Sequence, residues 1–213
     1  TSINPTYYVS NGYLIFMPDI VYTIGYPGQS ALKCVLPGVQ AVVDKGYVNE
    51  NAIGIQGHSW GGYQFAYMVT QTNRFKAVMV GAGLTNMFSM YSTNDLQRVL
   101  EGYFGAQPWD DLEAYWIKTS AMAHIKKAKT PTLILHGAND QRVPVGQAQE
   151  LYMGLKKNGV PAQLVFFPRE GHGLQEPRHQ LDKMKREYAH FAKYVLGVEE
   201  KDEKKETQAP TGN

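Results

Sequence analysis

The chain has 213 residues, of which 43% are hydrophobic, and its formal net charge is +2. This length and composition fit one medium-sized domain with a real apolar core. The near balance of charge gives no indication of a nucleic-acid partner or an anionic membrane surface, and no apolar run reaches the roughly 18 residues of a membrane span. The single cysteine, Cys34, excludes a framework of internal disulfides.

Apolar runs separated by turn residues predict alternating strands and helices along the chain. Strands are expected over residues 12–19, 52–56, 75–81, 132–135 and 162–167. Helices are expected over about 30–45, with an interruption at Pro37, and over 63–73, 145–158 and 177–196, with a long, mostly helical and aromatic insertion over 84–128. Alternating units of this size predict an α/β fold, a mostly parallel sheet flanked by helices on both faces.

The last residues differ in composition from the rest of the chain. Residues 198–213 are charged and polar and lack core residues, so we expect a disordered tail after a domain that spans residues 1–197. The chain begins without methionine and without a signal-peptide pattern. The compartment stays open, with a periplasmic or secreted location favoured over the cytoplasm.

Residues 57–61, Gly-His-Ser-Trp-Gly, lie between the expected strand over 52–56 and the expected helix over 63–73. A Gly-x-Ser-x-Gly motif at a sharp strand-to-helix turn is typical of a nucleophile elbow, in which the serine hydroxyl stands clear of the sheet edge. The motif therefore predicts Ser59 as a nucleophile. The simpler alternative is a serine that only caps the following helix.

The other two members of a hydrolytic triad are found further along the chain. Asp140 follows the expected strand over 132–135, and His172 follows the strand over 162–167. Ser, acid, His is the chain order of α/β hydrolases, and the carboxyl ends of parallel strands are where open α/β sheets place their sites. A histidine base activates the serine, and the acid orients the histidine. The alternatives are an ordinary turn aspartate and an ordinary glycine-flanked loop histidine.

Other residues near the motifs receive smaller roles. The backbone amide of Trp60, the residue after the nucleophile, is the expected donor to the oxyanion. The histidines inside the motifs, His58 and His136, are expected to pack beside the site. Those in the predicted helices are expected to be ordinary; these are His124, His179 and His190. Because no set of residues shows convincing metal-ligand spacing, we expect no metal and no cofactor.

Three segments together carry a family resemblance. They are Gly-His-Ser-Trp-Gly-Gly-Tyr at 57–63, His-Gly-x-x-Asp-x-x-Val-Pro at 136–144 and Gly-His-Gly at 171–173. The chain resembles the prolyl oligopeptidase family of serine peptidases, which includes dipeptidyl peptidases and acylaminoacyl peptidases, over about residues 10–197. The resemblance implies an α/β-hydrolase catalytic domain. In the family this domain usually sits behind a β-propeller that limits substrates to short peptides.

The resemblance also implies which residues bind substrate. An arginine at the place of Arg142 binds a substrate backbone carbonyl in several members, although a surface arginine is the simpler alternative. The pocket for the side chain before the scissile bond is built from the insertion and the residue after the nucleophile, although core packing is the default reading of apolar residues there. The candidate substrate-binding residues are Arg142, Trp60, Leu84, Met87, Phe88, Tyr91 and Val143. No acid or base is obvious among the insertion residues, so an apolar or proline side chain is expected.

The chain departs from the family pattern at its beginning. The strand over 13–17 resembles the fourth strand of an α/β hydrolase and that over 52–56 the fifth, and the strand that lies between them in space has no counterpart. The sheet is therefore expected to lack its first strands. We expect a missing N-terminal segment or propeller domain, supplied by residues before Thr1, another chain or a cleaved fragment; a homo-oligomer is left open.

These observations leave three functions open. The first is a serine hydrolase that cleaves peptide bonds of short peptides through an acyl-enzyme. The second is a carboxylesterase that uses the same triad on acyl esters, because many α/β hydrolases do both and the fold alone does not decide. The third is a non-catalytic fragment or interaction module, since the missing strands could leave this piece inactive.

Overall fold

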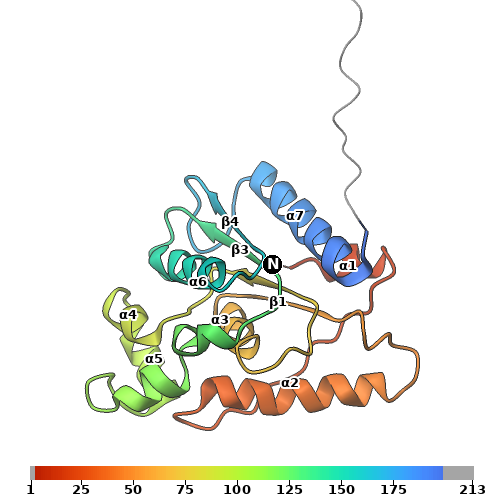
Figure 1. Cartoon of the computed structure of the whole chain (residues 1–213). Coiled ribbons are helices and arrows are strands. Elements are labelled where there is room, and N and C mark those ends of the chain that lie inside the picture. The colour runs from red at the N-terminus through yellow and green to blue at the C-terminus, as the bar shows by residue number, and fades with distance from the viewer. Residues whose placement is uncertain (1–2, 199–213) are drawn as a thin grey trace, which may run out of the picture.

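The computed structural model describes residues 3–198, and at its centre lies a sheet of four parallel strands (Figure 1). The strand order equals the order in the chain, from β1 at one edge to β4 at the other. The strands are β1 Gly54–His58, β2 Ala77–Gly81, β3 Thr132–Gly137 and β4 Ala162–Phe167. The predicted α/β fold is confirmed, and these four predicted strands are present with ends shifted by two residues at most.

Helices surround the sheet. The long helices and the elbow helix are α2 Pro27–Val43, α3 Trp60–Met68, α6 Gly146–Lys157 and α7 Pro177–Leu196, preceded by the short α1 Pro5–Val9. The expected interruption at Pro37 is wrong, because α2 runs through it. Pro37 has no N–H to donate to the carbonyl oxygen four residues earlier in the helix. Because Pro37 is exposed, water can donate to that oxygen instead.

The core lies on both faces of the sheet. On one face Val78, Val80 and Ile134 pack against α2, α3 and α6. On the other face Met79 and Leu133 pack against α1 and α7, and Figure 1 shows these two helices on the side of the sheet away from α2 and α3. Because successive strand residues point to opposite faces, a sheet covered on both sides needs the nearly continuous apolar strands seen here.

The insertion between β2 and β3 is mostly helical, as predicted. It contains α4 Met87–Ser92, α5 Gln97–Phe104, a π-helix over Glu113–Lys118 and a 3₁₀-helix over Ala121–Lys127. Its apolar side chains form a separate cluster with the elbow helix, which joins Tyr63 and Tyr67 of α3 with residues of α4, α5 and the π-helix. The insertion is thereby fixed next to the turn that carries Ser59.

The predicted strand over residues 12–19 is wrong. This segment has no strand structure, and β1 pairs only with β2 among the described residues. A strand needs a neighbour to take its backbone hydrogen bonds, and the described sheet provides none between this segment and β1. Leu14, Phe16 and Met17 are correspondingly 64%, 44% and 76% exposed. The described sheet lacks the first strands, as the sequence predicted.

Two further expectations concern the ends of the chain and membranes. Apart from Val198, the tail predicted over 198–213 lies outside the described residues, and the domain limits remain a prediction. Within residues 3–198, no helix combines the length and the apolar character needed to cross a membrane.

His190 on α7 makes stability depend on pH. Burial lowers its pKa to about 4, so between about pH 4 and the ordinary histidine value of about 6.5 the unfolded chain binds more protons than the folded one. Stability should therefore fall as the pH drops through this window.

We expect His190→Phe to weaken this dependence, by at most about 1.4 kcal/mol per pH unit. Urea denaturation of the natural protein and the variant at pH 6.5 and pH 4.5 measures the effect. The free energy of unfolding should fall less in the variant than in the wild type between pH 6.5 and pH 4.5. A stability difference between the two proteins that is the same at both pH values would contradict the assignment.

Candidate active site

Ser59 occupies a sharp turn between β1 and α3. Its backbone has φ 58° and ψ −122°, in the left-handed region that costs a non-glycine residue energy. The Ser59 amide donates to the carbonyl oxygen of Gly81 at 2.8 Å, and the Tyr63 amide donates to the carbonyl oxygen of Ser59 at 3.0 Å. These two bonds hold the strained turn between the end of β2 and the first turn of α3, which is the geometry predicted for a nucleophile elbow.

Asp140 and His172 lie in adjacent loops, because β3 and β4 are paired neighbours in the sheet. Asp140 follows the end of β3, and His172 follows the end of β4. The Asn139 amide donates to the carbonyl oxygen of Glu170 at 2.8 Å, which joins the two loops directly. Two residues that are 32 positions apart in the chain therefore meet beyond the carboxyl ends of β3 and β4.

The three predicted triad side chains form one chain of hydrogen bonds. His172 Nε2 lies 2.8 Å from Ser59 Oγ, and His172 Nδ1 lies 2.9 Å from Asp140 Oδ2. With the ring proton on Nδ1, the imidazole donates to the carboxylate and accepts from the serine hydroxyl. The structure thus brings together Ser59, Asp140 and His172 at distances that permit proton transfer.

Asp140 is held as an anion. Its Oδ1 accepts from the amides of Arg142 and Val143, each at 2.9 Å, and its Oδ2 lies 3.4 Å from His136 Nε2. Burial by itself would raise the pKa of Asp140, but hydrogen bonds from His136, His172 and the Val143 amide outweigh it and hold the pKa well below its usual range. The charge beside His172 Nδ1 is therefore permanent near neutral pH.

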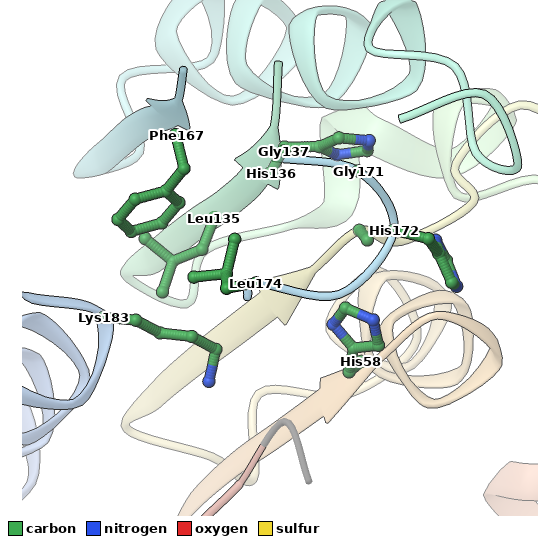
Figure 2. Close-up of a pocket in the computed structure, with 10 residues that line it drawn as sticks. His58, Leu135, His136, Gly137, Phe167, Gly171, His172, Leu174 and Lys183 are labelled. Atoms are coloured by element: carbon green, nitrogen blue, oxygen red, sulfur yellow. The ribbon is translucent and has the colours of Figure 1, made fainter. Parts of the chain in front are cut away.

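A second imidazole, that of His58, lies beside His172, as Figure 2 shows. The ring centroids of His58 and His172 are 5.0 Å apart. Burial, together with the nearby His172 and Lys183, lowers the pKa of His58 to about 4, so His58 is neutral near pH 7. The two rings and Lys183 line a cavity of about 10 Å³, which has room for about one water molecule.

A larger cavity of about 270 Å³ opens on the other side of Ser59 and His172. Four of the candidate substrate-binding residues line it, namely Trp60, Leu84, Arg142 and Val143. The other three, Met87, Phe88 and Tyr91, do not belong to its lining. Met87 and Tyr91 are buried in the cluster between the insertion and α3, whereas Phe88 is 41% exposed.

Helix α5 provides the wall of this cavity that the sequence analysis did not find. Leu96, which precedes the helix, and Val99, Leu100 and Tyr103 within it line the cavity with Met90 of α4. Their spacing of three and four residues is the signal that could have revealed one helix face. The Tyr103 ring stacks on Trp60, with centroids 4.2 Å apart.

One group of side chains could hold a metal ion. Ligand atoms of Glu170, Glu176 and His179 lie within 4.8 Å of one another, in the part of the chain that the structure describes. The sequence analysis did not name Glu170 or Glu176, and it expected His179 to be an ordinary helix histidine. Glu170 and His179 are already hydrogen-bonded to each other, and Glu176 forms an ion pair with Arg169.

The parallel sheet, the serine elbow and the adjoining acid and histidine loops define an α/β hydrolase. A model of the prolyl oligopeptidase family matches residues 23–198. The chain belongs to this family, and the resemblance carried by the three sequence motifs is confirmed.

Individual relatives agree with this assignment. An uncharacterized peptidase of Bacillus subtilis is 33% identical to this chain over 69% of this chain's length. Acylamino-acid-releasing enzyme 1 of Oryza sativa is 31% identical over 74% of this chain's length. A solved acylaminoacyl peptidase in complex with Z-Gly-Gly-Phe-chloromethyl ketone superposes with a TM-score of 0.77 at 25% identity, over 84% of this chain and 30% of that one. The chain spans 22% of the length of each of the two sequence relatives.

The two glycines of the elbow differ in the space around them for a Cβ atom. A Cβ at Gly57 would lie 2.4 Å from the carbonyl atoms of Gly61, whereas a Cβ at Gly61 would meet nothing within 4 Å. We expect Gly57→Ala to destabilise the fold by on the order of 3 kcal/mol, because the backbone of the turn must move apart.

Gly61→Ala is the matched control and should leave stability unchanged or slightly improved, because Gly61 lies in α3 and alanine favours helix. Thermal unfolding of both variants measures the difference. Equal losses of stability in the two variants would contradict the steric account of the elbow.

Proposed function

We propose that this chain carries the catalytic centre of a serine peptidase, with Ser59 as nucleophile, His172 as general base and Asp140 as the acid that orients His172. The observation that supports this most strongly is the continuous hydrogen-bond chain from Ser59 Oγ through His172 to Asp140. A serine hydroxyl is a weak nucleophile at neutral pH and needs a base within hydrogen-bond reach.

The reaction follows from these contacts. As Ser59 Oγ attacks the carbonyl carbon of the substrate, its proton moves to His172 Nε2, and the ionised Asp140 stabilises the imidazolium that forms. His172 then gives the proton to the leaving amine, and the peptide bond breaks to leave an acyl group on Ser59. A water molecule that gives a proton to His172 attacks this ester, and His172 returns the proton to Ser59 Oγ as the acid product leaves.

The amide of Trp60 is suited to the oxyanion of the tetrahedral intermediate. Trp60 is the first residue of α3, so its N–H has no acceptor inside the helix. The N-terminal end of a helix also carries a partial positive charge. A donor fixed in this position stabilises negative charge that develops on the substrate oxygen during attack.

The cavity beside Ser59 is suited to an apolar side chain before the scissile bond. Apart from the triad residues, its lining is aliphatic and aromatic with one cation, Arg142, which is exposed and can bind a substrate backbone carbonyl. The chloromethyl ketone in the solved relative has phenylalanine next to its reactive group. We therefore include peptides with apolar or proline residues at this position in the proposed substrate class.

Replacement of the nucleophile tests the proposal. We expect Ser59→Ala to abolish labelling by a fluorophosphonate probe and to lower kcat by at least about a thousandfold, because only binding and the oxyanion donor remain. Ser92→Ala, at an exposed serine of α4, is the matched control and should keep full activity and labelling.

The assay uses the natural protein that carries this sequence, with a peptide amide and an ester of the same acyl group. Labelling or hydrolysis that survives Ser59→Ala would remove Ser59 from the mechanism. Hydrolysis of the ester without any hydrolysis of the peptide would assign the site to a carboxylesterase.

A charge at the rim of the cavity should change substrate preference. Val99 lines the cavity and is 51% exposed, so a charged residue there is tolerated by the fold. Val99→Asp should raise kcat/KM for lysine over aspartate before the scissile bond by about fivefold or more, since two charges near a protein surface interact by about 1 kcal/mol or more.

Val99→Lys is the counterpart and should shift the same ratio in the opposite direction. The measurement is kcat/KM with paired peptides that differ only at this residue. If neither variant changes the ratio, the cavity does not bind the side chain before the scissile bond.

A further inference from the structure

The loop that carries His172 needs a restraint from outside itself. Residues 168–176 connect β4 to α7, and within this connection glycines lie on both sides of His172. Glycine has more conformational freedom to lose on ordering than any other residue. The imidazole nevertheless has to stay within hydrogen-bond distance of both Ser59 and Asp140.

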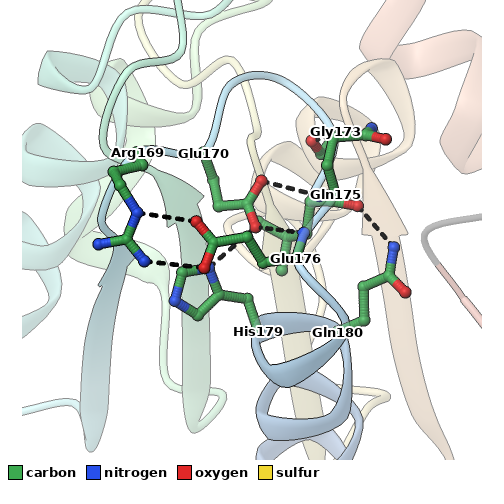
Figure 3. Close-up of polar contacts among 8 residues, drawn as sticks. Arg169, Glu170, Gly173, Gln175, Glu176, His179 and Gln180 are labelled. Atoms are coloured by element: carbon green, nitrogen blue, oxygen red, sulfur yellow. Dashed lines mark hydrogen bonds and ion pairs between the residues drawn. The ribbon is translucent and has the colours of Figure 1, made fainter.

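Glu170 closes this loop with its side chain, as Figure 3 shows. Its Oε2 accepts from the Gln175 amide at 2.7 Å, and its Oε1 accepts from the Glu176 amide at 2.9 Å. Oε1 also lies 2.9 Å from His179 Nδ1, in the first turn of α7. The residue is only 2% exposed. A carboxylate at the start of the loop thus binds the backbone at the loop's end.

The same carboxylate lies at the N-terminus of α7. Glu176 precedes the first residue of this helix, and its own side chain makes no capping hydrogen bond. It forms instead two 2.8 Å bonds with the exposed Arg169 guanidinium. The buried Glu170 carboxylate binds the amides of Gln175 and Glu176 just before the helix, where the helix N-terminus favours negative charge. Burial alone would raise the pKa of Glu170, but the bonds from the two amides and His179 lower it.

Glu170 also contacts the loop of the acid. Its backbone carbonyl accepts from the Asn139 amide at 2.8 Å, and Asn139 directly precedes Asp140. The backbone of Glu170 is therefore fixed to the Asp140 loop, and its side chain is fixed to the far end of the His172 loop. A change at this carboxylate would alter the position of His172 relative to its two partners.

We propose that Glu170 is a positioning residue, whose carboxylate holds the His172 loop closed so that the imidazole bridges Ser59 and Asp140. This inference rests on the proposed function of the triad. Glu170 touches neither substrate nor the reacting atoms and acts through the loop alone.

Glu170→Gln tests the inference, because the amide group replaces one acceptor oxygen with an NH₂ that cannot accept from a backbone N–H. Per active site counted by burst titration, kcat should fall about tenfold to a hundredfold with KM changed less than twofold. Labelling of Ser59 by a fluorophosphonate should slow by a similar factor. A variant that is merely less stable has fewer active sites, but each site keeps its rate.

Glu176→Gln is the matched control. It weakens the exposed pair with Arg169 and a 3.7 Å contact with His179, and it leaves the hydrogen bonds of the Glu170 carboxylate in place. Exposed ion pairs contribute little, so the rate per active site should stay within twofold of the wild type. Wild-type kcat per site in Glu170→Gln, or an equal loss in both variants, would overturn the inference. Activity that survives Ser59→Ala would instead refute the triad, whatever the result at Glu170.

Hydrogen exchange in the unmodified protein tests the same contact without a substitution. Gln175 is exposed, but its amide is bound to Glu170, so it should exchange at least about tenfold more slowly than an unstructured amide. Exchange at the unstructured rate would overturn the inference even if the Glu170 variant failed to fold.

Discussion

The position of the site depends on the parallel pairing of the strands. Because β1, β3 and β4 run in the same direction, their carboxyl ends lie on the same side of the sheet. Ser59, Asp140 and His172 follow these strand ends. The hydrogen bond from Ser59 to His172 joins residues 113 positions apart. No local interaction could fix that distance, so the buried sheet and the helices packed on its two faces determine the geometry of the triad.

Burial and hydrogen bonds determine which titratable groups beside His172 carry a charge. Asp140 stays ionised, because backbone amides and two imidazoles bind its oxygens. His58 stays neutral, because burial and neighbouring positive charge oppose its protonation. The one anion beside His172 is thus fixed, and the adjacent imidazole adds no positive charge. The ionised Asp140 can therefore stabilise the imidazolium that forms on His172 in the proposed reaction.

The sequence predicted what local pattern and chain order determine, and failed where distant partners decide. The elbow motif at Ser59 and the places of Asp140 and His172 after apolar runs were enough to predict three side chains that the structure brings within hydrogen-bond distance. The strand expected over residues 12–19 is absent, because its apolar pattern has no neighbouring strand to pair with. The cavity wall on α5 and the contacts of Glu170 were missed, since both depend on which loops and helices meet in space.

The central claim is that Ser59 forms a covalent intermediate while the Trp60 amide binds the oxyanion. A crystal structure of the natural protein treated with a peptidyl phosphonate tests this most directly, because the phosphonate resembles the tetrahedral intermediate. The account predicts a bond from phosphorus to Ser59 Oγ, a phosphonyl oxygen within about 3 Å of the Trp60 amide, and the side chain in the cavity lined by α5. Attachment to another residue, or an oxygen pointing away from Trp60, would contradict it.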